Sequence, residues 1–234
     1  MSTAKKLAKA VLRRVSRTLA RVDASSLTRT QPVSRRFGLE RGSPIDRHYI
    51  EAFVRSHVTR ISGDVLEIGE ARYAKLPGAT PRRIDVLHAT ADNPNATLVG
   101  DLTAPATLPA DAYDCVICTQ TLGFIYDVAA AVRGVHQLLR PGGTALVTAA
   151  GISQISRYDM DRWGDYWRFT DASLQRLFEP VFGPVEVASH GNVAAAVALL
   201  QGLAVEDLDD PAILDANDRD YPVVLAVRAT KSER

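Results

Sequence analysis

The sequence predicts an α/β fold in which a mostly parallel sheet is covered by helices on both faces. Five short apolar segments alternate with helical or loop segments along the chain: 64–68, 83–87, 97–99, 113–119 and 143–149. Apolar residues are in the majority in each, as is typical of strands buried on both faces of a parallel sheet. The length of 234 residues suits one large domain, or one domain with a short appendage.

Helix signals lie between and after these strand candidates. One helix is expected to begin after Pro44 and to run to about residue 57, and another to span about 128–139. A third, 173–178, precedes two more strand candidates, 185–190 and 223–229. The strands and helices therefore alternate as they do in a doubly wound sheet.

Charge divides the chain into two parts. The first 60 residues contain 14 Lys/Arg and 4 Asp/Glu, whereas the rest contain 14 and 23. Residues 4–22 predict a basic amphipathic helix with a Leu/Val stripe, and 23–42 predict a linker or lid. We therefore expect a small part, 1–42, followed by one domain, 43–234.

The basic segment has two interpretations. Its seven basic residues would suit the headgroups of an anionic membrane, in peripheral contact. Its apolar stripe would instead pack on the domain or on a second subunit, and this is the interpretation we favour. Neither a signal peptide nor a membrane span is expected, because Arg13 and Arg14 interrupt the N-terminal apolar residues and the longest apolar run is 193–200.

The two cysteines, Cys115 and Cys118, are too few for a secreted disulfide framework. A reducing, cytoplasmic location is therefore expected. Positions three apart on a strand point to opposite faces, so we expect two separate buried thiols rather than a metal or redox pair.

The residues at the predicted strand ends indicate a ligand. Ligands of open parallel sheets bind at the carboxyl ends of the strands. Gly69, after the first strand, lets a ligand approach the backbone. Asp85, at the second, would accept both hydroxyls of a ribose, and Asp101, after the third, would accept an adenine amino hydrogen. A dinucleotide is disfavoured because the motif G-x-G-x-x-G is absent.

Three motifs have the order and spacing of a known enzyme family: Leu66-Glu67-Ile68-Gly69, Asp101-Leu102 and Leu138-Leu139-Arg140-Pro141-Gly142-Gly143. With them, the chain resembles class I S-adenosylmethionine-dependent methyltransferases over about residues 44–229. The resemblance implies a Rossmann-like sheet with an antiparallel last strand and S-adenosyl-L-methionine as cofactor. It also implies, or leaves as candidates, these cofactor-binding residues: Tyr49, Glu67, Gly69, Glu70, Asp85, Val86, Asp101, Leu102 and Gln120.

The loop after the first strand departs from that family. The family has two or three glycines there, whereas Glu70, Ala71, Arg72 and Tyr73 follow Gly69 in this chain. We therefore expect side chains to hold the methionine part of the cofactor. The alternatives are Arg72 or Tyr73 from this loop, and Arg47 or Tyr49 from the preceding helix.

Residues 151–170 follow directly on the fifth strand and contain both tryptophans. Aromatic faces suit stacking on sugar rings, and Asp and Arg suit contacts to hydroxyls. The segment is similar to methyltransferases found with glycan-assembly enzymes, including a branch that O-methylates mannose oligosaccharides. This resemblance implies a sugar hydroxyl of an oligo- or polysaccharide precursor as acceptor. The predicted substrate contacts are Arg157, Tyr158, Trp163 and Tyr166.

Methyl transfer to a sugar hydroxyl requires a positioned oxygen and a base for its proton. The candidate catalytic residues are Asp161, Asp165 and His190. Asp159, Asp161 and Asp165 would also offer oxygen ligands to Mg²⁺, but their spacing matches no recognised metal loop, so a metal is not favoured.

The alternative function is an enzyme of the same fold that methylates a lipid-linked or small-molecule hydroxyl while the basic segment binds an anionic membrane. Nucleic acid is not expected as a partner, because the aromatic segment is not interleaved with a basic cluster. A homodimer is expected, with a contact formed by the alanine-rich helix predicted at 193–204 and the excursion that follows it.

Overall fold

The computed structural model describes residues 30–233, which contain a seven-stranded sheet in the order β3-β2-β1-β4-β5-β7-β6. The strands in chain order are β1 (Ser62–Ile68), β2 (Thr80–His88), β3 (Leu98–Val99), β4 (Tyr113–Thr119), β5 (Leu139–Ala150), β6 (Glu186–His190) and β7 (Val224–Thr230). The first five strands pair in parallel, and β7 is antiparallel to both β5 and β6. The predicted mostly parallel sheet with an antiparallel last strand is confirmed. The predicted basic helix 4–22 lies outside the described residues.

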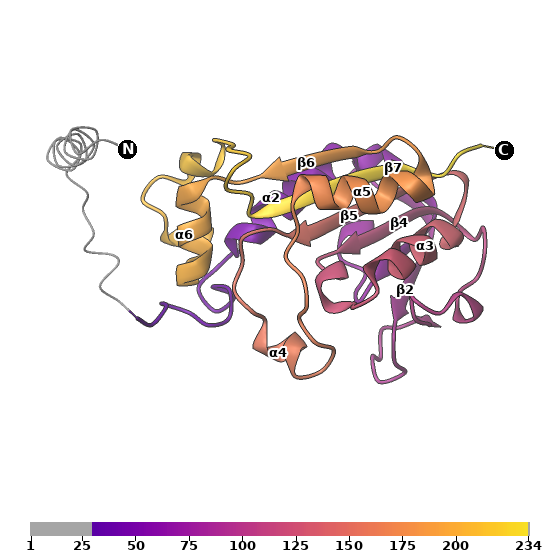
Figure 1. Ribbon diagram of the computed structural model, residues 1–234, viewed down its shortest axis with the longest axis horizontal. Helices are drawn as coiled ribbons and strands as arrows, with labels where there is room; N and C mark the ends of the chain where they lie inside the picture. Colours follow the sequence, from indigo (N-terminus) through magenta and orange to yellow (C-terminus); the bar gives the residue numbers. More distant parts are fainter. Residues whose placement is uncertain (1–29, 234) are drawn as a thin grey trace, which may run out of the picture. The chain divides into compact units, whose positions relative to one another are not determined.

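Helices cover both faces of the sheet. They are α2 (Ile45–Ser56), α3 (Val128–Leu138), α4 (Arg157–Met160), α5 (Asp171–Phe182) and α6 (Val193–Gln201). Helices α3 and α5 share one apolar core with the sheet, and α2 and α6 share the other. Figure 1 shows α3 and α5 in front of the sheet and α2 behind it.

Local sequence sets the helix boundaries. The side chains of Asp127, Thr170 and Asn192 each accept the N–H of the residue three positions later, at the starts of α3, α5 and α6. Gly202 ends α6 with φ 68°, a left-handed conformation that glycine adopts readily. These caps fix where the helices begin and end. They therefore also fix where β5 and β6, and the segments that follow these strands, lie along the chain.

The crossover from β1 to β2 contains only a short 3₁₀ turn, Tyr73–Lys75, and no helix connects β2 to β3. A cavity of about 360 Å³ lies beside β2, and Ile84 and Val86 line it. Val86, predicted to bind the cofactor, lines this cavity and none of the three that form the site described below. The cofactor role of Val86 therefore stays a prediction.

The two cysteines lie on β4 and are buried in different cores, Cys115 on the α2 side and Cys118 on the α3 side. Burial raises the pKa of each thiol to about 12. The prediction of two separate core thiols is confirmed.

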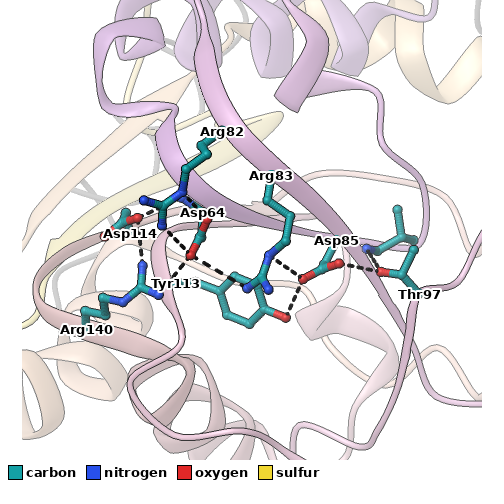
Figure 2. A network of polar contacts seen from close by, with 9 residues as sticks. Asp64, Arg82, Arg83, Asp85, Thr97, Tyr113, Asp114 and Arg140 are labelled. Carbon is teal, nitrogen blue, oxygen red and sulfur yellow. Dashed lines mark hydrogen bonds and ion pairs between the residues drawn. The ribbon is translucent and has the colours of Figure 1, made fainter.

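Strand β2 extends to His88, one residue past the predicted segment 83–87 and three residues past Asp85. Asp85 therefore lies within the strand, opposite Leu66 of β1. Its carboxylate accepts hydrogen bonds from Tyr113 Oη and Thr97 Oγ1, both at 3.0 Å, and Arg83 Nε lies 3.2 Å away (Figure 2). The prediction that Asp85 lies at the strand end is wrong, and its carboxylate is bound inside the sheet; ribose binding by Asp85 stays a prediction.

Asp64, near the start of β1, is a second buried acid in this network. Its carboxylate accepts hydrogen bonds from Arg82 at 2.8 and 3.0 Å and from Arg140 at 2.9 Å, and Arg140 also binds Asp114 at 2.8 Å (Figure 2). Arg82 and Arg140 hold the pKa of Asp64 well below its usual range. The network connects β1, β2, β4 and β5 at the end of the sheet opposite the carboxyl ends of these parallel strands.

We expect Asp64→Asn to lower the Tm by several degrees at neutral pH, because it leaves two guanidinium groups without their shared anion. A lowered pKa in the folded state means that the contribution is present above the unfolded-state pKa, about 3.9, and is lost as the pH falls through the folded value. Thermal unfolding followed by circular dichroism between pH 7 and pH 3 should show the difference shrinking in acid. The control Glu186→Gln removes an exposed partner of Arg228 and should change little; an equal loss in both variants would contradict the argument.

Candidate active site

Three cavities meet at the carboxyl ends of the central strands. The first, about 280 Å³, lies between α2 and the loop after β1 and is lined by Arg47, Glu67, Glu70, Arg72 and Tyr73 among others. The second, about 180 Å³, lies against the segment after β5 and is lined by Ser153, Gln154, Ser156, Asp165, Trp167 and Arg168 among others. The third, about 600 Å³, lies at the ends of β2 and β3 and is lined by His88, Asp101, Leu102, Tyr126, Trp163 and Tyr166 among others.

Shared residues show that the cavities are adjacent. Ile68 and Gly69 line the first and third, and Phe124 and Asp159 line the second and third. The first and second share Phe37, Asp46 and Gln120. The cavities therefore form one site at the strand ends, where the sequence predicted a ligand.

The first cavity is built on the turn that follows β1. Gly69 has φ 86°, and the buried carboxylate of Glu67 accepts the N–H groups of Tyr73 and Ala74 at 2.8 to 3.0 Å. Burial raises the pKa of Glu67, although these hydrogen bonds oppose the shift. Glu67 thus anchors, through hydrogen bonds from the backbone, a loop that contains only one glycine. Glu70 lies on the rim of the first cavity.

The third cavity combines an apolar floor with one acid. Leu87, Leu102 and Ile125 line it together with Asp101. One oxygen of Asp101 accepts the N–H and the Oγ1 hydrogen of Thr103 at 2.8 and 2.9 Å. Asp101 and Leu102, predicted to bind the cofactor, both line this cavity, and a volume of about 600 Å³ would hold a nucleoside.

The aromatic segment closes over the third cavity. Trp163 packs edge-on against His88, at 5.7 Å between ring centroids. Tyr126 contacts Tyr166 and Trp167 at 5.4 and 5.7 Å, and Trp167 Nε1 donates to the Tyr126 carbonyl oxygen at 3.2 Å. Trp163 and Tyr166, predicted to bind substrate, therefore line the cavity that contains Asp101.

Two other predicted substrate residues lie outside the site. Arg157 and Tyr158 line none of the three cavities, and the Tyr158 ring is exposed and covered on one face by Arg162 at 3.5 Å. The single turn of α4 directs both side chains to solvent. The assignment of these two residues to substrate stays a prediction.

The predicted catalytic aspartates differ in their surroundings. Asp161 is exposed, lies 3.8 Å from Arg157 and lines none of the three cavities, and its assignment as the base stays a prediction. Asp165 lines the second cavity, but its side chain is 1% exposed and accepts hydrogen bonds from Arg168 at 2.5 and 3.0 Å and from the Ser156 N–H at 2.9 Å. Burial raises the pKa of Asp165, but these bonds outweigh it and leave the pKa below its usual value. Asp165 is therefore poorly suited to accept a proton and well suited to hold Arg168 and the Ser156 backbone in place.

His190 and Tyr49 lie in the core between α2 and the sheet. Their rings stack at 6.3 Å, and Tyr49 Oη donates to the Leu214 carbonyl oxygen at 3.1 Å. Burial lowers the pKa of His190. Neither residue lines any of the three cavities, and the base assignment of His190 and the cofactor assignment of Tyr49 stay predictions.

The two cavity residues Asp46 and Phe37 were not predicted. Asp46 lies in the first turn of α2, and Phe37 lies in the segment expected to be a linker or lid. Phe37 has φ 58°, and the Oγ of buried Ser34 accepts the N–H groups of Arg36 and Gly38 beside it. A strained non-glycine residue is often found at a functional site, but nothing in the sequence marks it.

No group of three His, Cys, Asp or Glu side chains is placed to hold a metal ion within residues 30–233, Asp159, Asp161 and Asp165 included. Over the same range, none of the helices combines the length and the apolar composition that a bilayer span requires.

Comparison with known proteins decides the family. The pattern of a family described as a methyltransferase domain matches residues 47–182. The chain belongs to this methyltransferase family. Among curated proteins, none matches the chain in sequence.

Three solved structures have the same fold as this methyltransferase. An S-adenosylmethionine-dependent methyltransferase from Mesorhizobium loti is 18% identical (TM-score 0.53; 80% of this chain, 98% of that one). The N-methyltransferase NodS from Bradyrhizobium japonicum is 16% identical (TM-score 0.51; 81% and 98%). An S-adenosylmethionine-dependent methyltransferase from Archaeoglobus fulgidus is 13% identical (TM-score 0.51; 79% and 94%).

S-adenosyl-L-methionine is the cofactor of this methyltransferase, and the site fits it. The third cavity has the volume and the apolar floor for the adenosine, with Asp101 as its acid. The first cavity has Arg47 and Arg72 for the carboxylate of the methionine part. Gly69, whose Cβ position is open space, lies where the two cavities meet.

We expect Asp101→Asn to weaken S-adenosylhomocysteine binding about tenfold. Thr103 holds one oxygen of Asp101, so the asparagine would keep its oxygen there and turn its NH₂ group toward the adenine amino group. The matched variant Asp85→Asn should lower the Tm without changing the affinity, because Asp85 is bound within the sheet. Titration calorimetry would measure both; weaker binding by Asp85→Asn alone would support the sequence prediction.

Proposed function

We propose that this methyltransferase transfers the methyl group of S-adenosyl-L-methionine to a sugar hydroxyl of an oligo- or polysaccharide precursor. The second cavity is the observation that carries the proposal. It combines the ring of Trp167 with polar side chains, of which Ser153, Gln154 and Arg168 are examples. An aromatic face beside groups that bind hydroxyls suits a sugar ring.

The wall of the second cavity is fixed to the end of β4. The N–H groups of Tyr166 and Trp167 both donate to the Gly123 carbonyl oxygen, at 2.9 and 3.2 Å. Asp165 fixes the Arg168 guanidinium on the same wall. When bound, the cofactor supplies an activated methyl group, so the chain's contribution is to hold the acceptor oxygen in line and to accept its proton.

Methyl transfer from radiolabelled S-adenosyl-L-methionine to a panel of oligosaccharides, amines and phenols tests the proposal. We expect label on a sugar, in a form that resists alkaline hydrolysis as an ether does. Parallel reactions with a chelator test for a metal requirement. Label confined to amines or phenols would overturn the sugar assignment while leaving the methyltransferase activity in place.

A second candidate is transfer to a lipid-linked or small-molecule hydroxyl. The exposed rings of Tyr126 and Tyr166 at the rim of the third cavity support it, because they would also contact an apolar tail. Peripheral membrane contact through residues 4–22 belongs to this candidate. Co-sedimentation with anionic liposomes, with and without residues 1–22, would separate the two candidates.

The proposed homodimer would use α6. Its inner face buries Ala195 and Leu199 against the domain, whereas Val193, Val197 and Leu200 are 44 to 53% exposed. These three apolar side chains recur at spacings of four and three, so they share one helix face. Sedimentation velocity of the wild type and of Val197→Glu would test the contact.

A further inference from the structure

Three residues line both the first and the second cavity: Phe37, Asp46 and Gln120. The first cavity suits the methionine part of the cofactor, and the second suits the acceptor. A methyl group passing from one to the other must therefore pass these three side chains. Phe37 offers only an apolar surface, so polar chemistry at this junction falls to Asp46 and Gln120.

Gln120, directly after β4, has two unfavourable features. Its backbone has φ 52°, a left-handed conformation that is costly for a residue with a side chain. Its Nε2 is buried and has no hydrogen-bond partner within residues 30–233, although its backbone N–H donates to the Thr148 carbonyl oxygen at 2.8 Å. A buried unpaired donor and backbone strain each reduce stability. Both are explained if the amide is held ready for a ligand oxygen.

Asp46, in the first turn of α2, is the acid at the junction. Its Oδ1 accepts the Arg47 N–H at 2.8 Å, and burial raises the pKa of Asp46, with a smaller opposing effect from Arg47. A carboxylate whose pKa is raised binds a proton more readily than an exposed one, which favours proton transfer at neutral pH.

The other acids of the two cavities are less available. Glu67 accepts backbone N–H groups, and Asp165 is bound to Arg168. Asp159 accepts the hydroxyl hydrogen of Ser156 and lies where the second cavity meets the third, not the first. Among these acids, only Asp46 lines both the first and the second cavity.

We propose that Asp46 is the general base of methyl transfer and that the side-chain amide of Gln120 orients the acceptor oxygen. This inference rests on the proposed function, because only an acceptor that loses a proton, such as a hydroxyl, needs a base.

The step balances as follows. The acceptor oxygen forms the new O–CH₃ bond while the S–CH₃ bond breaks and its electron pair stays on sulfur. The hydroxyl proton passes to the Asp46 carboxylate and then to solvent. Gln120 Nε2 donates a hydrogen bond to the acceptor oxygen, which leaves a lone pair of that oxygen free to attack.

Several charged groups share the two cavities with Asp46. Those that share the first cavity with it are Arg47, Glu67, Glu70 and Arg72. Those that share the second are Asp159, Asp165 and Arg168. Acidic and basic side chains are therefore present in both cavities.

The variant Asp46→Asn keeps an acceptor for the Arg47 N–H and removes the base. We expect kcat to fall about 100-fold or more, with KM for the acceptor and the Kd for S-adenosylhomocysteine changing less than about threefold. The acid limb of the wild-type kcat profile should lie above the usual carboxylate range and be absent from the variant. The matched control Asp209→Asn, an exposed acid that lines none of the three cavities, should keep wild-type kcat.

Thermal unfolding, which needs no acceptor substrate, complements these kinetic measurements. Because the folded-state pKa of Asp46 is raised, its contribution to stability is present below the unfolded pKa and is lost as the pH rises through the folded value. Asp46→Asn should therefore have a higher Tm than wild type at neutral pH, and the gain should vanish in acid. Gln120→Asn tolerates the left-handed backbone but shortens the reach of the amide, so it should fold normally and lose kcat at least tenfold.

Three results would overturn the inference. One is an Asp46→Asn variant with wild-type kcat on a hydroxyl acceptor. Another is a loss of S-adenosylhomocysteine affinity greater than tenfold in that variant, which would make Asp46 a ligand of the cofactor's ammonium group. The third is methylation of amines alone by the wild type, which would remove the proposed function as well, whereas the first two results would leave it standing.

Discussion

Replacing Glu67 with alanine is expected to destabilise the protein by about 2–4 kcal/mol and to weaken S-adenosylhomocysteine binding more than tenfold. The Glu67 carboxylate is 1% exposed and accepts the N–H groups of Tyr73 and Ala74. Alanine would leave both donors buried without an acceptor. The turn from Gly69 to Tyr73 forms one wall of the first cavity, so the methionine part of the cofactor would lose that wall. Urea unfolding and titration calorimetry measure the two effects.

Two variants separate this role from that of a surface acid. Glu67→Gln keeps one acceptor oxygen but places an NH₂ group near the Tyr73 and Ala74 donors, so an intermediate loss is expected. Glu70→Gln changes an exposed acid on the rim of the same cavity and should leave stability unchanged. Equal stability of all three variants would show that the hydrogen bonds of Glu67 contribute nothing.

The parallel strands were the easiest elements to predict. The segment 113–119 was predicted as a strand with the observed bounds of β4, because a strand buried on both faces is apolar throughout. The placing of Asp85 at the end of β2 was wrong, because an acid that interrupts an apolar run resembles a terminus. The strand continues because Leu87 and His88 pair with Leu98 and Val99 of β3, a long-range contact that no local pattern contains.

Part of the site could be predicted, because some of its residues lie just after strands. Gly69, Asp101 and Gln120 follow strands directly, so the position of a strand end also gave their position. Asp161 and Asp165 lie four residues apart in a loop, and only the turn of α4 and the ion pair with Arg168 decide which of them is buried. Asp46 enters the site from a helix that precedes the whole sheet, and its distance in sequence from the strand ends concealed it.

Asp165→Ala is expected to lower the free energy of unfolding by about 2–3 kcal/mol and to raise the KM for the acceptor at least tenfold. The variant would leave the Arg168 guanidinium and the Ser156 N–H without their shared acceptor. Both groups line the second cavity, so the acceptor would meet a wall that is no longer held in place. The wall of the third cavity is held separately, by the contact between the rings of Trp163 and His88. The affinity for S-adenosylhomocysteine should therefore change much less.

Acceptor kinetics distinguish this anchoring role from the catalytic role that the sequence predicted. Loss of a base would lower kcat and leave both KM and stability as they are, whereas loss of the anchor raises KM and lowers stability. Because the pKa of Asp165 is lowered in the folded state, the stability difference between wild type and Asp165→Ala should be present above about pH 4 and shrink as the pH falls further. Asp165→Asn, which keeps one acceptor oxygen, should recover part of the affinity for the acceptor. A variant that loses kcat alone would return Asp165 to the chemistry and would weaken the assignment of Asp46, since one hydroxyl proton needs only one base.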